Sequence, residues 1–300
     1  MKRSHLFSYF LILLGASCWG SIGLFNRLLG ADGVSMLNRV AVRNIGALLL
    51  LSVVFLLFRR QVFRIRLRHI PIFMASGIIS VLGLAWFYFN CQMECSLAVA
   101  GILLYLAPSF VMIAGAVLWK SPFTCRKTIV LLLSLIGCCF VSGLIGNETV
   151  IPSPKGLLMG LFSALCYASY TIFAHYGLRY YDSLTMIYWT FVFAGLGSLL
   201  FLDLPDLASV LGNSASSLHI LGLIVVATVL PYLLYTQGLD NADPCYASLL
   251  SNIEPVVAAL IGVIAFGEKL DIWLILGIAF ILFGTVILAM QRKNSPEIGR

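Results

Sequence analysis

Long apolar stretches alternate with short polar connectors from one end of the chain to the other. Windows of about 20 predominantly apolar residues, the length that an α-helix needs to cross a bilayer, recur ten times. They cover approximately residues 7–28, 34–58, 69–90, 95–118, 126–145, 155–177, 183–202, 216–237, 243–266 and 271–290. This pattern predicts an all-α integral membrane protein with ten transmembrane helices and little chain left for a soluble domain.

The two halves of the chain repeat one pattern. Pro108 and Pro255 each lie near the middle of an apolar stretch, 147 positions apart, and short segments around them align at nearly the same offset. Proline lacks an N–H and clashes with the preceding turn, so we expect a helix break at each proline. Five spans per copy is an odd number, so the second copy enters the membrane from the opposite face. We therefore predict two inverted five-helix repeats, residues 1–148 and 149–300, with the substrate site between them.

The composition also indicates a protein embedded in a lipid bilayer. Of the 300 residues, 61% are hydrophobic and only 10% are charged, whereas a typical soluble domain has about 25% charged residues. Lipid is therefore an expected partner. Cys18, Cys138, Cys139 and Cys166 lie inside predicted spans, where cysteine behaves as a small apolar residue. Cys91 and Cys95 share an outward-facing edge, and the sequence leaves undecided whether a disulfide links them. We expect no metal and no cofactor.

The basic residues concentrate on one side of the predicted membrane. If the N-terminus is cytoplasmic, the inside connectors and ends hold 14 of the 19 lysines and arginines. These are Lys2, Arg3, Arg59, Arg60, Arg64, Arg66, Arg68, Lys120, Arg126, Lys127, Arg179, Arg292, Lys293 and Arg300. This bias predicts a multi-pass protein of the cytoplasmic (inner) membrane with both termini in the cytoplasm. The net charge of +7 then reflects topology and contact with anionic lipid, and no nucleic-acid partner is expected. Residues 1–18 resemble a signal peptide, but nine further spans favour an uncleaved first helix.

Three segments carry a family resemblance. They are Leu-Gly-Ala-Ser-Cys-Trp-Gly-Ser at 14–21, Val-Ala-Val-Arg43 in the second span, and Asn-Ile-Glu-Pro-Val-Val-Ala-Ala-Leu-Ile-Gly-Val-Ile-Ala-Phe-Gly-Glu at 252–268. Together they resemble the EamA-type transporters of the drug/metabolite transporter (DMT) superfamily. The resemblance implies ten helices in two inverted repeats and transport of small metabolites without ATP hydrolysis, and it leaves the cargo open. In one departure, the Gly-Glu pair that often follows the fourth helix is missing here, whereas Gly267-Glu268 follows the ninth.

Glu254 is the sharpest candidate for a substrate or proton site. It lies eleven residues or so inside the ninth span, about 16 Å deep at the rise of an α-helix. An ionisable group at that depth is costly and indicates function by default. Ser248 and Ser251 precede it at steps of three along the helix, and the helix break at Pro255 frees a backbone carbonyl nearby. The alternative is a structural glutamate that holds the kink.

Arg39 and Arg43 lie one turn apart on one face of the second span. Arg39 is about 7 Å from the outer boundary, whereas Arg43 is about 13 Å deep and needs a partner or a water-filled cavity. Because a guanidinium binds carboxylates through forked donors, both are candidates for a gating ion pair or an anion contact near the outer vestibule. The alternative is that they tie helix ends together.

Aromatic residues occur at comparable depth in several spans. Trp19 and Tyr167 occupy matching positions in the two halves, and Tyr88 and Tyr105 add further rings. Other rings at this depth are Tyr170, Trp189, Tyr232 and Tyr235. Aromatic walls around a central acid suit an ammonium group through cation–π attraction. We expect Trp19 and Tyr167 on opposite walls of a central chamber, although helix packing is the alternative for each ring.

These features favour a secondary carrier for a small polar or amphipathic metabolite, most simply an amino acid or amine, working by alternating access with Glu254 available for proton coupling. No nucleotide-binding loop is present. A channel-like facilitator stays open as an alternative. An intramembrane enzyme is disfavoured, because the paired catalytic groups that it needs are missing from the spans. The sequence leaves the cargo, the direction of transport and the oligomeric state undetermined.

Overall fold

Helices make up the regular secondary structure of the part of the chain that the structure describes. The computed structural model describes residues 5–142, 153–205, 207 and 214–289. Eight helices in these ranges are long and apolar enough to cross a membrane, so the predicted class of α-helical membrane protein is confirmed. They are His5–Ala31, Met36–Phe58, Leu67–Glu94, Val99–Trp119, Pro154–Gly177, Ser183–Phe201, Ser214–Leu239 and Pro244–Phe266.

The other two predicted spans correspond to shorter helices. Helix α8, Cys125–Val141, begins with charged residues, and the apolar part of α16 covers Ile272–Leu288. Seventeen helical residues span about 26 Å, less than the hydrocarbon thickness of about 30 Å. Eight helices thus meet the length expected of a membrane-spanning helix, and two lie slightly below it.

Several spans consist of consecutive helical segments. The α-helices are α1 (His5–Trp19), α2 (Ile22–Ala31), α3 (Met36–Phe58), α4 (Ile70–Met74), α5 (Leu84–Glu94), α6 (Leu97–Leu104), α7 (Ala107–Trp119), α8 (Cys125–Val141), α9 (Pro154–Gly177), α10 (Ser183–Ser198), α12 (Ser214–Ile224), α13 (Leu230–Leu239), α14 (Pro244–Leu250), α15 (Glu254–Phe266) and α16 (Ile272–Ala289). The break between α6 and α7 comes directly before Pro108, and that between α14 and α15 comes directly before Pro255. Each proline lies in the first turn of the new helix, where its missing N–H costs no hydrogen bond.

Irregular backbone recurs at corresponding places in the two halves. A π-helical segment, Ala75–Gly83, joins α4 to α5, and another, Val225–Val229, joins α12 to α13. Lys120 caps the C-terminal end of α7 and Gly267 caps that of α15, both in the left-handed conformation (φ 53° and 67°), 147 positions apart. Glycine adopts this conformation without strain, whereas lysine adopts it rarely. The second half therefore repeats local backbone features of the first.

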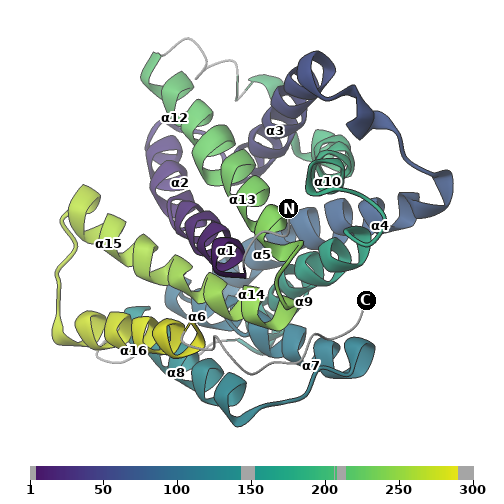
Figure 1. Ribbon diagram of the computed structural model, residues 1–300. Helices are drawn as coiled ribbons and strands as arrows, with labels where there is room; N and C mark the ends of the chain where they lie inside the picture. The colour runs from purple at the N-terminus through teal and green to yellow at the C-terminus, as the bar shows by residue number, and fades with distance from the viewer. Residues whose placement is uncertain (1–4, 143–152, 206, 208–213, 290–300) are drawn as a thin grey trace.

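Helices of the first half pack against helices of the second half. Helices α8 and α16 lie along each other, α3 packs on α10, α1 packs on α13 and α5 packs on α9 (Figure 1). Small residues allow a close approach between α8 and α16. A Cβ on Gly137 would lie 2.8 Å from the carbonyl oxygen of Gly277, and a Cβ on Gly277 would lie 2.7 Å from the carbonyl oxygen of Gly137. Without a hydrophobic driving force between helices in lipid, such backbone contact is a main source of association.

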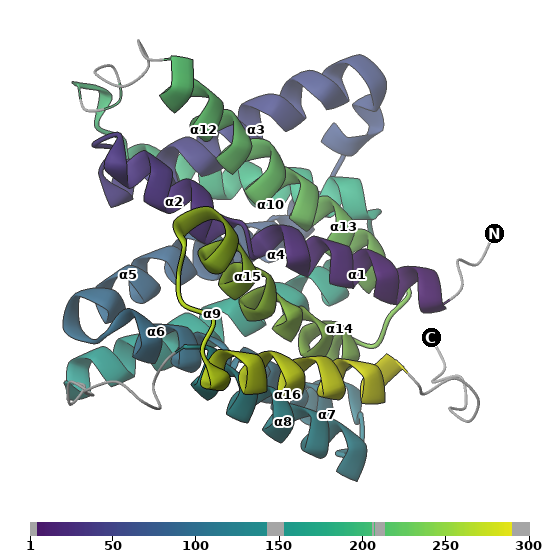
Figure 2. The same ribbon diagram turned by 90° about the vertical axis from the view of Figure 1, so that its left-hand side faces the viewer.

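The connectors gather at two ends of the bundle. Figure 2 shows the start of α1, the end of α13 and the end of α16 at one end, together with the 59–69 connector. We call this the basic end, because its connectors carry Arg59, Arg60, Arg64, Arg66, Arg68, Lys120 and Arg179. The turn from α2 to α3 and the start of α12 lie at the opposite end. There, the hydrogen bond of 2.9 Å from His219 holds the pKa of Asp32 below its usual range.

Candidate substrate site

The helix break in the ninth span places a carboxyl group at a helix N-terminus. A short 3₁₀ turn, Ser251–Ile253, separates α14 from α15, and Glu254 is the first residue of α15. The N–H of Glu254 donates to the Ser251 carbonyl across this turn, and the following residue, Pro255, has no N–H. The break thus places the Glu254 carboxyl group at the junction of α14 and α15.

Glu254 is bound by a residue from another helix of the same half of the chain. The hydroxyl of Tyr167, from the middle of α9, donates a hydrogen bond of 2.8 Å to Oε2 of Glu254. The sequence predicted these two residues as site candidates separately, and the structure brings them into direct contact. Tyr88 and Tyr105 also lie within electrostatic range of the Glu254 carboxyl.

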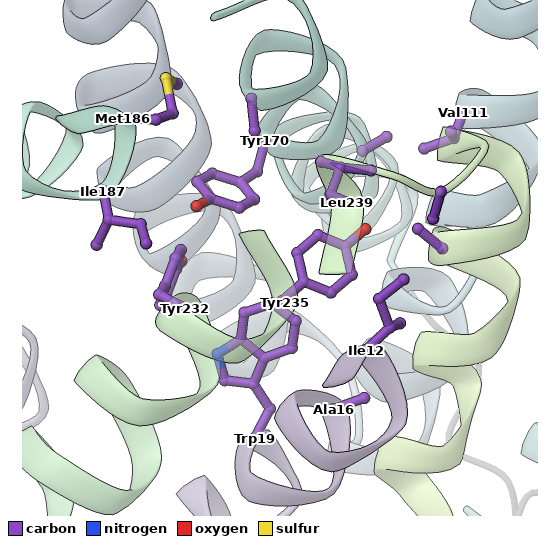
Figure 3. Packing of buried hydrophobic residues seen from close by; sticks show 14 of the residues in the cluster. Ile12, Ala16, Trp19, Val111, Tyr170, Met186, Ile187, Tyr232, Tyr235 and Leu239 are labelled. Atoms are coloured by element: carbon purple, nitrogen blue, oxygen red, sulfur yellow. The ribbon is translucent and has the colours of Figure 1, made fainter. Parts of the chain in front are cut away.

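An aromatic cluster fills the space beside this pair. The Trp19 ring, 5% exposed, meets Tyr167 edge to face with ring centroids 6.1 Å apart, and it also contacts Tyr232 at 5.2 Å and Tyr235 at 5.1 Å. Figure 3 shows Trp19 directly against Tyr235, with Tyr170 and Tyr232 alongside. The prediction that Trp19 and Tyr167 lie on opposite walls of a chamber is wrong in this conformation, because the two rings touch.

Threonines complete the polar contacts of the cluster. The Tyr235 hydroxyl pairs with Thr171 at 2.7 Å, and the Tyr170 hydroxyl pairs with Thr236 at 2.6 Å. Buried hydroxyls need such partners, because an unpaired one costs free energy. Sequence analysis missed both threonines, since each lies more than 60 positions from its tyrosine and neither stands out on its own helix.

The serines before Glu254 are less available than the sequence suggested. Ser248 donates to the Cys245 carbonyl at 3.1 Å, and Ser251 donates to the Ala247 carbonyl at 3.0 Å. Their hydroxyl protons are therefore used within α14 and its turn. Asn252 in the same turn was missed by the sequence analysis. It is 2% exposed, and its Nδ2 has no hydrogen-bond partner among the described residues.

The two arginines of α3 have different surroundings. Arg39 donates to the carbonyl of Asn26 and packs over Gly30, so it ties the end of α2 to the start of α3. Arg43 lies near Tyr232 and Glu254, close enough for its charge to act on both. Its Nε is buried and has no hydrogen-bond partner within the described ranges. The role of Arg43 as a gating or anion-binding residue stays a prediction.

A buried charged pair lies at the basic end, where the sequence analysis counted Lys127 only among the basic connector residues and did not single out Asp243. Lys127, 4% exposed at the start of α8, lies 3.5 Å from Asp243 and donates a 2.9 Å hydrogen bond to Ser121. Its Nζ also lies 5.0 Å from the ring centre of Tyr246. Asp243 caps α14 through the N–H of Cys245 at 2.7 Å. We call Lys127, Asp243, Ser121 and Tyr246 the basic-end cluster; it joins the α7–α8 region to the start of α14.

Metal-binding chemistry has little support in the described residues. They contain no group of three or more His, Cys, Asp or Glu side chains that could hold a metal ion. Cys91 and Cys95 are free thiols in the structure.

Comparison with protein families identifies the fold. The model of the EamA-like transporter family matches residues 6–143 and residues 154–290. The chain belongs to the EamA-like transporter family. It is therefore a member of the DMT superfamily, as the motifs in its sequence indicated.

Relatives of this EamA-like transporter carry transporter names. A protein of Archaeoglobus fulgidus named an uncharacterized transporter is 30% identical over 215 residues, which cover 69% of this chain and 75% of that protein. The inner membrane transporter YicL of Salmonella typhimurium, also named as uncharacterized, is 27% identical over 66% of this chain and 65% of its own length. A solved crystal structure superposes with a TM-score of 0.77 at 19% identity and covers 93% of this chain and 95% of the other. The chain is thus a multi-pass membrane protein of a transporter family.

The structure shows what the distinctive glutamate of this EamA-like transporter contacts. Glu268 follows the left-handed Gly267, accepts a 2.5 Å hydrogen bond from Arg27 of α2, and folds back over Gly262. The Arg27 guanidinium also lies 4.7 Å from the Phe266 ring centre. Glu268 therefore ties the end of α15 to α2 at the end opposite the basic one.

Proposed function

We propose that the protein is a secondary carrier that moves an amino acid or amine across the cytoplasmic membrane by alternating access. The observation that carries this proposal is the Glu254–Tyr167 pair inside an aromatic cluster, where α9, α13, α15 and the end of α1 meet. A carboxyl group ringed by aromatic faces can bind an ammonium group. A glutamate at this place can also take up a proton, which would couple transport to a proton gradient.

We further propose that the ten helices form two inverted repeats, residues 1–148 and 149–300. Three observations support this: the paired helix breaks, the paired π-helical segments and the left-handed helix ends at one offset. Packing supports it too. If each helix is replaced by its counterpart in the other half, the α1–α13 contact becomes the α9–α5 contact. The α3–α10 and α8–α16 contacts each join a helix to its own counterpart, so they are unchanged. Such symmetry lets one repeat rock against the other around a central site.

Topology is tested by single cysteines in a cysteine-free background. We expect Gln61→Cys, at the basic end, to resist an impermeant thiol reagent in intact cells, and Asp271→Cys, at the opposite end, to react. Both positions are exposed connectors, so reactivity reports the side of the membrane. Labelling of Gln61→Cys but not Asp271→Cys in intact cells contradicts the proposed orientation. The related position Asn147 lies outside the described residues.

The basic-end cluster is the proposed inner gate. Lys127 and Asp243 are charged, largely buried and drawn from different halves, so separating them exposes both charges to water. We expect Lys127→Gln and Asp243→Asn to favour the inward-open state and to speed labelling of the buried Cys245 thiol about tenfold, because loss of a buried charge partner costs more than 1.4 kcal/mol. Asparagine keeps the capping of α14. Stopped-flow labelling of purified protein with Cys245 as the sole cysteine measures this.

An exposed ion pair supplies the control for that experiment. Lys155 and Glu94 lie 2.6 Å apart at the opposite end, with most of the lysine exposed. Exposed pairs contribute about 1 kcal/mol or less, so Lys155→Gln should leave the labelling rate of Cys245 unchanged. If Lys127→Gln and Asp243→Asn label Cys245 at the same rate as Lys155→Gln, the basic-end cluster has no part in gating.

Counterflow separates a carrier from a channel. In proteoliposomes preloaded with unlabelled cargo, a carrier accelerates entry of labelled cargo, and its rate saturates with concentration. The touching rings of Trp19 and Tyr167 favour this outcome, because they leave no open path between them in this conformation. Flux that neither saturates nor counterflows supports the channel alternative.

A further inference from the structure

The connector between α3 and α4 carries a positive charge that the protein does not neutralise. Its arginines are all exposed, and no acid lies between them in the sequence. They are Arg59, Arg60, Arg64, Arg66 and Arg68. The ion pairs found among the described residues involve none of these five side chains. Since crowded like charges repel one another, an anion bound here would relieve an unfavourable field. We call residues 59–69 the arginine connector.

The arginine connector is fixed against the second half of the chain. Trp189 of α10 donates a 3.1 Å hydrogen bond from Nε1 to the carbonyl of Val62, which is 2% exposed. The backbone N–H of Arg66 donates a 2.9 Å hydrogen bond to the Tyr181 hydroxyl, and Nδ1 of His69 lies 2.8 Å from the same hydroxyl. A surface that is already fixed loses little freedom when it binds a ligand.

Apolar side chains alternate with the arginines. The backbone is extended at Arg64 (φ −91°, ψ 105°) and at Arg66 (φ −88°, ψ 132°), so neighbouring side chains point to opposite sides. Ile65 packs against the main core, whereas the two arginines are exposed. Leu67, the next residue, is 81% exposed, and Phe58 at the end of α3 is 77% exposed. Exposed apolar groups beside guanidinium groups fit the boundary between lipid headgroups and acyl chains, whereas a soluble anion cannot bury them.

The turn between α9 and α10 extends this surface. The Tyr180 ring centre lies 4.6 Å from that of His69 and 5.7 Å from that of Tyr176. The Arg179 guanidinium lies 5.6 Å from the Tyr176 ring centre. Arg179 and both tyrosines are exposed, and tyrosine is enriched at the boundary between membrane and water. The surface thus combines a connector of the first half with a turn of the second.

We propose that the arginine connector and Arg179 form a binding site for an anionic phospholipid. The guanidinium groups bind the phosphodiester through their forked donors, and Leu67 and Phe58 contact the acyl chains. Lipid binding is thereby assigned to one connector and one turn, beyond the general attraction of a basic membrane protein to anionic lipid. Because the site spans both halves, the bound lipid stabilises their present arrangement.

Native mass spectrometry of the purified protein in a neutral detergent tests the proposal. The probes are phosphatidylglycerol and phosphatidylcholine with identical acyl chains, which differ in net charge. We expect the first bound lipid to show a preference of about tenfold or more for phosphatidylglycerol, and this preference should shrink at high salt. Glycerol phosphate and polyglutamate, added as competitors at the same concentration of charge, should not displace the lipid, because neither can bury Leu67 and Phe58.

Variants then locate the site. Arg64→Gln combined with Arg66→Gln should lower the affinity for phosphatidylglycerol about tenfold and remove most of its preference over phosphatidylcholine. Lys155→Gln combined with Lys269→Gln removes the same net charge at the opposite end and should keep the full preference. Leu67→Gln should weaken the binding of both lipids about fivefold, because less apolar surface is buried. The unfolding midpoint of each variant without added lipid reports its folding.

The outcomes bear on the lipid site alone. Equal affinity for the two lipids overturns the proposal, as does a preference that survives the paired arginine changes or falls equally in the paired lysine variant. Displacement by glycerol phosphate or polyglutamate indicates a site for soluble anions and overturns the assignment to lipid. None of these results depends on transport, so counterflow tests the carrier function separately.

Discussion

Replacing Glu254 by glutamine should abolish the pH dependence of transport and lower its rate at least about tenfold, because hydrogen bonds to a charged group contribute about 1.5–3 kcal/mol. Glutamine has the same shape and can still accept a hydrogen bond from Tyr167, so α15 and its break should form normally. It cannot bind or release a proton, and it offers no charge to an ammonium group. Uptake into proteoliposomes with and without a pH gradient measures both effects.

Another glutamate of the same helix region is the control. Glu268 follows Gly267, the residue that caps the C-terminal end of α15. It is partly exposed and pairs with Arg27. Glu268→Gln removes a carboxylate of the same chemistry away from the aromatic cluster, and we expect its pH profile to match that of the wild type. Wild-type rates and an unchanged pH profile in Glu254→Gln would falsify the role of Glu254 in coupling and leave it a structural residue.

Replacing Gly137 by alanine should lower the free energy of unfolding by about 1–3 kcal/mol, the cost of overpacking a close contact. The new Cβ would lie 2.6 Å from Cγ1 of Ile281 and 2.8 Å from the Gly277 carbonyl oxygen. The second atom belongs to the backbone, so α8 and α16 must move apart. Unfolding of the purified protein, followed by tryptophan fluorescence, measures the change.

A second helical glycine, Gly101, is the control for the expected loss of stability. A Cβ on Gly101 in α6 meets nothing within 4 Å. Alanine there brings only its higher helix propensity, so Gly101→Ala should be neutral or stabilising by up to about 1 kcal/mol. The two Gly→Ala changes should thus move stability in opposite directions. If both stabilise the protein, the α8–α16 contact is looser than the structure indicates.

Much of the helical layout could be predicted from the sequence. The apolar windows located the helices to within a few residues, and Pro108 and Pro255 located two of the breaks. Both depend on local properties, namely the length of an apolar run and the missing N–H of proline. The π-helical segments were not predicted, because nothing in Ala75–Gly83 or Val225–Val229 interrupts the apolar pattern.

The candidate site was predicted as a set of residues and not as an arrangement. Depth along a helix follows from counting, and it singled out Glu254, Tyr167 and Trp19. Contacts between helices do not follow from counting. The Tyr167–Glu254 hydrogen bond joins residues 87 positions apart, and the Lys127–Asp243 pair joins residues 116 apart. Asn252 carried one usable signal, a polar side chain two residues before a buried acid, which the sequence analysis did not use.

By itself the sequence determined the membrane class, the family and the helix positions, because each of these follows from hydrophobicity, motif or position along one chain. Only the tertiary structure decided how each helix is rotated about its own axis. Apolar side chains surround most of these helices on every side, so no polar stripe marks the face that turns inward. Side-chain packing sets the rotation instead. That rotation brings Trp19 against Tyr167 and leaves Arg39 at the α2–α3 turn.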